Sequence, residues 1–244
     1  MPPTSRTVLV FDVLGTLVDQ VGSLEARVRQ HAGLGAGAAR DAVATWLDRV
    51  AEREGAVVEG RRGFAPSGAL DREVLAGLAA EGVLPASAVD RLATAAERLR
   101  PWPDSVAGLA ALAGDFTVLG LSNADRRTLA ALRADAGLAW HEALSAQDVG
   151  TYKPAPDLYA AAVAAAAAVA GRATATTGPA GPPVMVAAHA WDLRAAAAAG
   201  MRTAYVPRPR GDAPRADDAF DLHAADLADL RARLLAGGLR PPAG

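Results

Sequence analysis

The sequence predicts an α/β fold: a parallel sheet core with helices on both faces and a helical domain inserted after the first strand. Three short apolar runs, at residues 8–11, 116–121 and 184–188, indicate buried strands because their hydrophobicity is continuous rather than alternating. Each run is followed by polar residues and a stretch with helical spacing, an alternation typical of parallel sheets. A long helical block separates the first two runs, which favours an insertion at that point.

The composition restricts the class of protein. The chain has 244 residues, of which 51% are hydrophobic and 21% charged, so it suits one large domain or one domain with an insert. The net charge of -2 predicts no nucleic-acid partner. The absence of cysteine excludes disulfides, thiol catalysis and cysteine metal sites. No apolar stretch has the length of a signal peptide or a membrane helix, so we expect a cytoplasmic protein without a membrane partner.

The first apolar run ends in a carboxylate. The sequence after residue 8 reads V-L-V-F-D-V-L-G-T, so Asp12 closes the run and Gly15 and Thr16 follow. Glycine lets the chain turn at this point. Ligands of open α/β sheets bind at the carboxyl ends of the strands, which would place Asp12 where a nucleophile can act. The alternative is that Asp12 only caps a turn.

The block after this run is helical. Charged residues alternate with Leu, Val, Ala and Trp at helical spacing, and a breaker-rich loop divides the block near its middle. We assign residues 19–100 to a helical cap and residues 1–18 and 101–244 to the core. A four-helix bundle without a catalytic role is the alternative. The helices are expected at residues 23–33, 39–55, 70–82 and 86–99.

The second run, preceded by a helix at 104–113, is followed by a hydroxyl and an amide. Ser122 and Asn123 stand at its end, and a helix is expected at about 126–135. These groups can hydrogen-bond a substrate oxyanion or carboxylate. They can equally cap the helix that follows.

A proline-stiffened segment follows at residues 149–159, which read V-G-T-Y-K-P-A-P-D-L-Y. A Lys153 fixed near Asp12 would hold that carboxylate ionised, whereas an exposed loop lysine is the alternative. Tyr159 either faces the site or packs in the core. An Ala-rich helix should follow, and then a flexible connection over 171–183 without chemistry.

The third run leads into H-A-W-D-L-R at residues 189–194 and an Ala-rich helix. Asp192 is the single acid of this stretch, a poor set for Mg²⁺, which prefers several oxygen ligands. Asp192 could also be an N-cap, and His189 a ligand, a base or a satisfied histidine. Beyond it we expect a strand at 202–206, a surface loop at 207–218 and a helix at 223–236.

These four segments, in this order, resemble the four motifs of the haloacid dehalogenase (HAD) superfamily, and the resemblance covers nearly the whole chain. It implies a Rossmann-like core in which the Asp12 strand is central, with a helical cap closing over the site. It also implies that Asp12 attacks the substrate and is transiently esterified.

The details resemble the type II 2-haloacid dehalogenase branch more than the phosphatases. Phosphatases carry a second Asp, a general acid/base, where this chain has Leu14, and leucine cannot transfer a proton. Dehalogenases have Tyr there, and a halide leaves without a proton. The segment Tyr-Lys-Pro-x-Pro-x-x-Tyr is shared, as is Ala-Trp-Asp at residues 190–192. The dehalogenases' two serines and asparagine are replaced by Ala187, Ala188 and His189.

The resemblance implies a metal-free site for a small molecule, most simply a small carboxylate, and it leaves a homodimer open. Lys153 and Asp192 should face each other and Asp12. The catalytic residues it implies are Asp12, Lys153 and Asp192, and the substrate-binding residues are Leu14, Thr16, Ser122, Asn123, Tyr159, His189 and Trp191.

Three functions follow as hypotheses. The first is an (S)-2-haloacid dehalogenase acting through an aspartyl ester without metal. The second is a Mg²⁺-dependent phosphatase of a small phosphorylated metabolite, and the third is a non-catalytic binding protein derived from the family.

One departure concerns the cap. Dehalogenases carry a halide-contacting arginine one residue after a helix tryptophan, whereas Trp46 is followed by Leu47. Either Arg49, Arg53 or the arginine pair at 61–62 reaches the pocket, or Leu47, Trp46 and Phe64 make it apolar. We expect the apolar pocket.

Overall fold

A six-stranded parallel sheet forms the core of the computed structural model, which describes residues 7–173 and 181–239. The strand order is β5-β4-β1-β6-β7-β8, and β1 pairs in parallel with β4 on one side and β6 on the other. The first strand is therefore interior, as the family resemblance implied. The strands are β1 (Val8–Asp12), β4 (Thr117–Ser122), β5 (Glu142–Ser145), β6 (Val184–Ala187), β7 (Arg202–Tyr205) and β8 (Leu222–His223).

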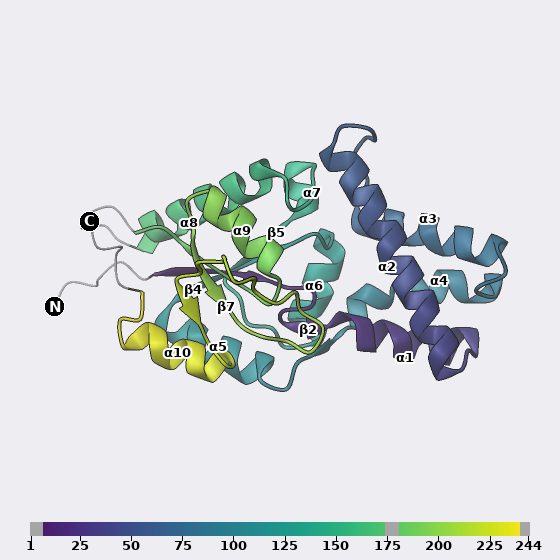
Figure 1. The fold of residues 1–244 in the computed structure, drawn as a ribbon, viewed down its shortest axis with the longest axis horizontal. Helices are drawn as coiled ribbons and strands as arrows, with labels where there is room; N and C mark the ends of the chain where they lie inside the picture. Colours follow the sequence, from purple (N-terminus) through teal and green to yellow (C-terminus); the bar gives the residue numbers. More distant parts are fainter. Residues whose placement is uncertain (1–6, 174–180, 240–244) are drawn as a thin grey trace.

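Helices cover both faces of the sheet, as predicted (Figure 1). Side chains alternate along β1: Leu9 and Phe11 join one apolar cluster, and Val8 and Val10 join the other. The Leu9 side packs on α5 (Ser105–Asp115), α6 (Arg126–Asp135) and α10 (Leu227–Leu235), and the Val8 side on α8 (Pro156–Ala173) and α9 (Ala190–Ala198).

The segment between β1 and α5 is mainly helical and lies to one side of the sheet (Figure 1). We call residues 19–100 the helical insert. A short antiparallel ribbon joins it to the core, because β2 (Val18–Asp19) pairs with β3 (Arg100–Pro101). The ribbon stands at the two predicted boundaries. The helices of the insert are α1 (Gln20–Ala32), α2 (Ala36–Val58), α3 (Ser67–Ala80), η1 (Ala86–Ala88), α4 (Val89–Leu92) and η2 (Ala95–Arg98).

The last predicted helix of the insert, 86–99, is broken into η1, α4 and η2. Thr94 interrupts it with a φ of -110° and a ψ of 11°. The buried side chains Ala88, Leu92, Ala95 and Leu99 keep a spacing of three to four residues, which 3₁₀ turns satisfy as well as an α-helix. The predicted spacing of the buried side chains was therefore right, but the prediction of one continuous helix was wrong.

The carboxyl-terminal part of the core differs from expectation in two places. The helix predicted from 223 begins at Leu227, because Leu222 and His223 form β8 and the Asp226 side chain caps α10. The loop at 207–218 is not wholly on the surface: the Arg208 side chain is 8% exposed, and its Nε donates to the Thr16 carbonyl at 2.9 Å.

Two other features complete the fold. A short helix that the sequence did not predict, α7 (Ala146–Val149), precedes the proline-stiffened segment. The connection predicted at 171–183 falls mostly outside the described residues, although α8 extends into it as far as Ala173. Within residues 7–173 and 181–239, no helix is long and apolar enough to span a bilayer.

Candidate active site

Three charged side chains meet at the carboxyl ends of the central strands. Asp12 ends β1, Asp192 lies in the first turn of α9 after β6, and Lys153 lies in the loop before α8. Lys153 Nζ donates to Asp12 Oδ1 at 2.9 Å and to Asp192 Oδ2 at 2.6 Å. All three residues are buried, at 6% exposure or less. The predicted placement of Lys153 between the two carboxylates is therefore confirmed.

Burial and neighbouring charges act in opposite directions on the pKa values of Lys153 and Asp192. Burial alone would lower the pKa of Lys153, but the neighbouring carboxylates of Asp12 and Asp192 outweigh it and raise that pKa. Burial raises the pKa of Asp192, and the Lys153 ammonium opposes that rise. The ammonium therefore stays charged and supplies the positive charge between the two acids.

Two hydroxyls fix the carboxylates. Thr16 Oγ1 donates to Asp12 Oδ2 at 2.6 Å and accepts from the Ala188 N–H at 2.9 Å. Tyr159 OH donates to Asp192 Oδ1 at 2.5 Å, and burial raises the pKa of this phenol. Tyr159 is fully buried, so it both packs in the core and contacts the site. Thr16 gives its single hydrogen to Asp12 and so orients that carboxylate.

The turn after Asp12 needs glycine. Gly15 has a φ of 84°, and a Cβ there would lie 2.5 Å from His189 Nε2. The Gly15 carbonyl also accepts from Trp102 Nε1 at 3.0 Å. The imidazole of His189 therefore lies against the backbone of the turn that follows the nucleophile candidate.

Asn123 links the core to the helical insert. Its Oδ1 accepts from the Lys153 N–H at 2.8 Å, and its Nδ2 donates to Glu54 Oε2 at 2.8 Å. Ser122 is fully buried, and its Oγ accepts from the Ala124 N–H at 3.1 Å. Both residues thus act within the site's own hydrogen bonds, one of which crosses to the insert.

The other predicted substrate-binding residues lie outside this network. Leu14 is half-buried and packs against the apolar cluster of the sheet face. His189 is half-buried, with its ring centroid 6.0 Å from that of Trp191. Trp191 is 39% exposed. None of these three side chains contacts the buried charges through a hydrogen bond described above.

The arginines of the insert pair with its own glutamates. Arg49 makes a bidentate pair with Glu81 at 2.7 and 2.9 Å, and Arg53 donates to Glu73 at 3.0 Å. Arg62 also pairs with Glu73, and the remaining pair joins Arg61 to Glu59. These four guanidinium groups are therefore paired within the insert rather than with the acids of the site.

The apolar pocket that we expected over Asp12 stays a prediction, and the structure places its three side chains as follows. Trp46 is 1% exposed and its Nε1 donates to Asp71 at 2.7 Å, so its ring is enclosed within the insert. Leu47 packs against the same apolar cluster. The ring of Phe64 packs at a tilt against that of Tyr152, with centroids 5.3 Å apart. Tyr152 directly precedes Lys153 in the chain.

The sequence analysis missed Glu54. This half-buried residue lies on α2, and burial raises its pKa to about 8, against the opposing effect of the Asn123 hydrogen bond. The stretch A-E-R-E-G is typical of a solvated helix face, so its composition does not indicate that Glu54 is half-buried. Its helical phase could have revealed it, because Glu54 follows Trp46 and Val50 at intervals of four, and both pack in the apolar cluster.

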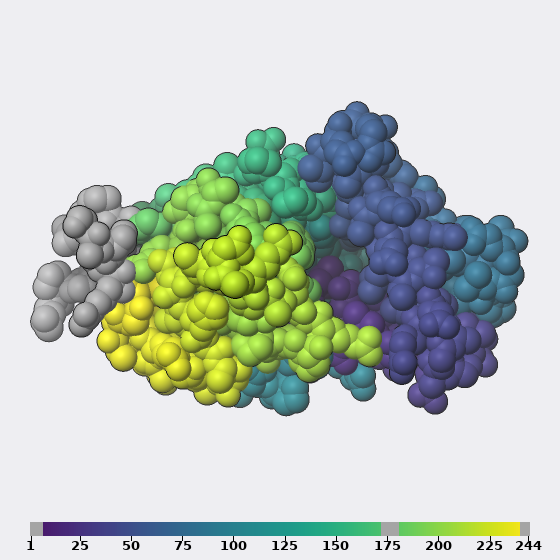
Figure 2. All heavy atoms as spheres, in the orientation of Figure 1, coloured from purple at the N-terminus to yellow at the C-terminus, as the bar shows by residue number. Residues whose placement is uncertain are grey.

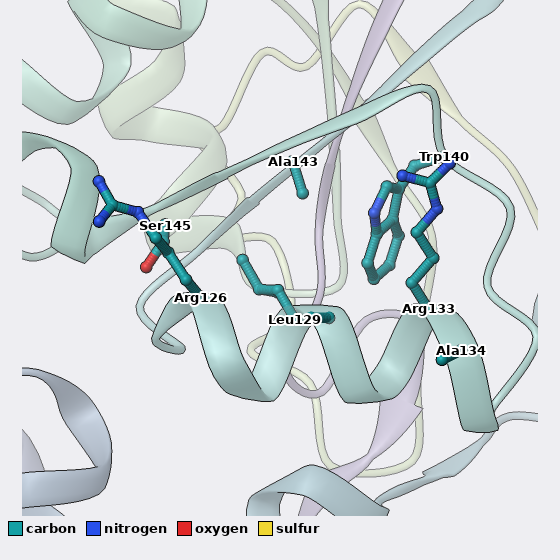
Figure 3. Close-up of a pocket in the computed structure, with 8 residues that line it drawn as sticks. Arg126, Leu129, Arg133, Ala134, Trp140, Ala143 and Ser145 are labelled. Atoms are coloured by element: carbon teal, nitrogen blue, oxygen red, sulfur yellow. The ribbon is translucent and has the colours of Figure 1, made fainter.

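The part of the chain that the structure describes has no group of three or more His, Cys, Asp or Glu side chains that could hold a metal ion. Figure 2 shows a furrow between the blue insert and the green and yellow core, with purple N-terminal residues visible in it. A separate hollow lies beside edge strand β5 (Figure 3), lined by Arg126, Leu129, Trp140 and Ser145 among others. None of the predicted site residues lines that hollow.

The chain is similar to solved dehalogenases over almost its whole length. The L-2-haloacid dehalogenase PA0810 is 31% identical, with a TM-score of 0.80 over 95% of this chain and 99% of that one. The defluorinating L-2-haloacid dehalogenase Rha0230 is 29% identical, with a TM-score of 0.79 over 96% and 100%.

The L-2-haloacid dehalogenase from Xanthobacter autotrophicus, with chloropropionic acid covalently bound, is 26% identical, with a TM-score of 0.72 over 94% and 98%. No curated protein matches the chain significantly. The model of the haloacid dehalogenase-like hydrolases matches residues 7–200. The match covers most of the chain and contains Asp12, Lys153 and Asp192. The chain therefore belongs to the haloacid dehalogenase-like hydrolase family, and it is a hydrolase.

Proposed function

We propose that the protein is a metal-independent (S)-2-haloacid dehalogenase that works through an ester on Asp12. The observation that carries this proposal is the Lys153 ammonium, 2.9 Å from Asp12 and 2.6 Å from Asp192. One buried ammonium group thus forms ion pairs with both carboxylates. Leu14 stands where a phosphatase of this family needs a proton-transferring acid, whereas a halide leaves without a proton.

In the first step, an oxygen of Asp12 attacks the carbon that bears the halogen. The new C–O bond forms as the carbon–halogen bond breaks, and the halide leaves with the electron pair. The hydrogen bonds from Lys153 and Thr16 prevent the carboxylate from rotating, so the reacting oxygen is held in position.

In the second step, water attacks Cγ of the esterified Asp12. Asp192, held by Lys153 and Tyr159, accepts one proton of the water. The ester C–O bond then breaks, and the leaving alkoxide takes that proton to give the 2-hydroxy acid. The second proton of the water is released as the Asp12 carboxylate is restored.

We also propose that the helical insert, residues 19–100, acts as a cap. The two-stranded ribbon joins it to the core, and the Asn123–Glu54 hydrogen bond connects it to the site. The similarity to a dehalogenase that holds chloropropionic acid covalently supports the ester chemistry. The cap would then shield the ester from bulk water and choose the substrate.

Halide and phosphate release test this function directly. The protein is incubated with both enantiomers of 2-chloropropionate, and separately with a panel of small phosphate esters, each with EDTA or with added Mg²⁺. We expect chloride release from the (S) enantiomer that changes less than about twofold with EDTA or Mg²⁺. Phosphate release that is lost with EDTA and restored by Mg²⁺ would establish the phosphatase hypothesis instead.

A further inference from the structure

A cap carboxyl group lies where the substrate's carboxylate was expected to bind. Glu54, on α2, accepts a hydrogen bond from Asn123 Nδ2 at 2.8 Å. The Asn123 Oδ1 is already used by the Lys153 N–H at 2.8 Å, which fixes the orientation of the amide. Only the N–H groups of Asn123 can therefore face an anion, and one of them points to Glu54.

The other expected carboxylate ligands are also engaged. Thr16 gives its hydroxyl hydrogen to Asp12, and Ser122 is fully buried. Arg49 and Arg53 of α2 pair with Glu81 and Glu73. A substrate carboxylate that reaches Asn123 thus meets Glu54, without an arginine to offset the charge.

The groups around Glu54 decide its protonation. Asp71 on α3 disfavours the ionised form and Lys153 favours it, while Asn123 stabilises it by its hydrogen bond. The charge of Glu54 in turn acts on the neighbouring phenol of Tyr152 and raises its pKa. Burial is the largest influence and raises the pKa of Glu54 to about 8. At neutral pH the carboxyl group is therefore mostly protonated, and its O–H can act as a donor.

We propose that Glu54 is a specificity-determining residue, whose protonated carboxyl group donates a hydrogen bond from the cap to the substrate's carboxylate and whose ionised form repels it. The inference rests on the proposed function only for the choice of a carboxylate substrate. The protonated acid can bind the carboxylate only over a limited pH range, because its ionised form repels an anion.

Propionate binding tests the proposal without turnover, because propionate carries no halogen. Calorimetry gives the Kd at pH 7 and pH 9 for the wild type, for Glu54→Gln and for the control Glu52→Gln, an exposed acid on the same helix. The wild-type Kd should rise about tenfold between these pH values, as a group of pKa near 8 ionises. Glu52→Gln should behave in the same way.

Glu54→Gln should bind propionate with a Kd that is the same at both pH values, because its amide stays neutral and still donates. With 2-chloropropionate, the wild-type KM should rise with pH as the propionate Kd does, while kcat stays nearly constant. Asp71, whose pKa burial raises to about 7, is controlled for, because its titration would persist in Glu54→Gln. Unchanged thermal melting of the variant would show that it folds.

A tenfold pH dependence retained in Glu54→Gln would overturn the inference, as would the absence of propionate binding to the wild type at either pH. Chloride release combined with an unchanged pH profile in the variant would reject the role of Glu54 and leave the dehalogenase function standing. The predicted propionate binding without chloride release would support Glu54 and reject the dehalogenase.

Discussion

The ion pairs of the candidate site and those on the surface of the helical insert lie in opposite environments. In the core, the side chains of Asp12, Lys153 and Asp192 are 8%, 2% and 0% exposed and share one ammonium. In the cap, the typical pair is Arg49 with Glu81, whose side chains are 32% and 49% exposed. A buried charge must be paired in one geometry, whereas an exposed pair contributes little and can be replaced at small cost.

The difference bears on how far a substitution in each region should be felt. The core charges are interdependent, because each accepts or donates a hydrogen bond that another needs. The insert reaches the site through the hydrogen bond that Asn123 donates to Glu54. Substitutions should therefore have large effects in the core and small effects on the exposed face of the cap.

Asp12→Asn should have the largest effect. It removes the nucleophile but keeps the shape of the side chain, so kcat should fall at least about 10³-fold while the melting temperature hardly changes. Chloride release and circular dichroism are the measurements. Full activity in this variant would end the enzymatic interpretation of the site.

Lys153→Met should damage both stability and activity. Two buried carboxylates would lose their cation, and breaking such a pair typically costs about 3–5 kcal/mol of unfolding free energy. Urea titration at pH 7 measures the loss. A variant as stable as the wild type would show that the buried ion pair does not hold the two acids together.

Tyr159→Phe should have an intermediate effect. It removes only the hydrogen bond from the phenol to Asp192, leaving the ring in the core. A hydrogen bond to a charged group contributes about 1.5–3 kcal/mol, so kcat should fall roughly ten- to hundredfold. The slow step should be ester hydrolysis, which a burst of chloride in rapid-mixing experiments would show. A wild-type kcat without a burst would contradict the role of Asp192 in the attack of water on the ester.

Arg49→Met should have the smallest effect. Its pair with Glu81 lies at the surface of the cap, so the free energy of unfolding should change by about 1 kcal/mol or less. The kcat/KM for 2-chloropropionate should change less than about threefold. A loss of a hundredfold would mean that Arg49 leaves Glu81 and binds the halide when substrate is present, which would contradict the comparison of core and cap.

The sequence predicted the parts of the site that parallel strands bring together. Asp12 and Asp192 follow adjacent strands, whose carboxyl ends necessarily share one edge. A further signal was present in Lys153, which is the only lysine of the chain among many arginines. An ammonium is a compact charge with three donors, so Lys153 can hydrogen-bond both carboxylates at once.

The rest depends on contacts that local sequence does not encode. Glu54 stands in a charged helical run, and only the docking of α2 on Asn123 places it at the site. Arg208 lies in a Pro-, Gly- and Asp-rich loop typical of a surface, yet the loop folds back onto the Thr16 carbonyl. The strands β2, β3 and β8 have two residues each, too few for a periodic pattern.

In the proposed reaction, Asp12 becomes an ester whose carbonyl carbon is attacked by water. A single turnover of excess enzyme with (S)-2-chloropropionate in H₂¹⁸O tests this step, and mass spectrometry of the digested protein gives the peptide masses. We expect one ¹⁸O atom in the peptide that contains Asp12 and none in the 2-hydroxy acid, because the product takes its oxygen from the carboxylate. An ¹⁸O atom in the product with an unlabelled Asp12 peptide would contradict it, since water would then attack the substrate directly.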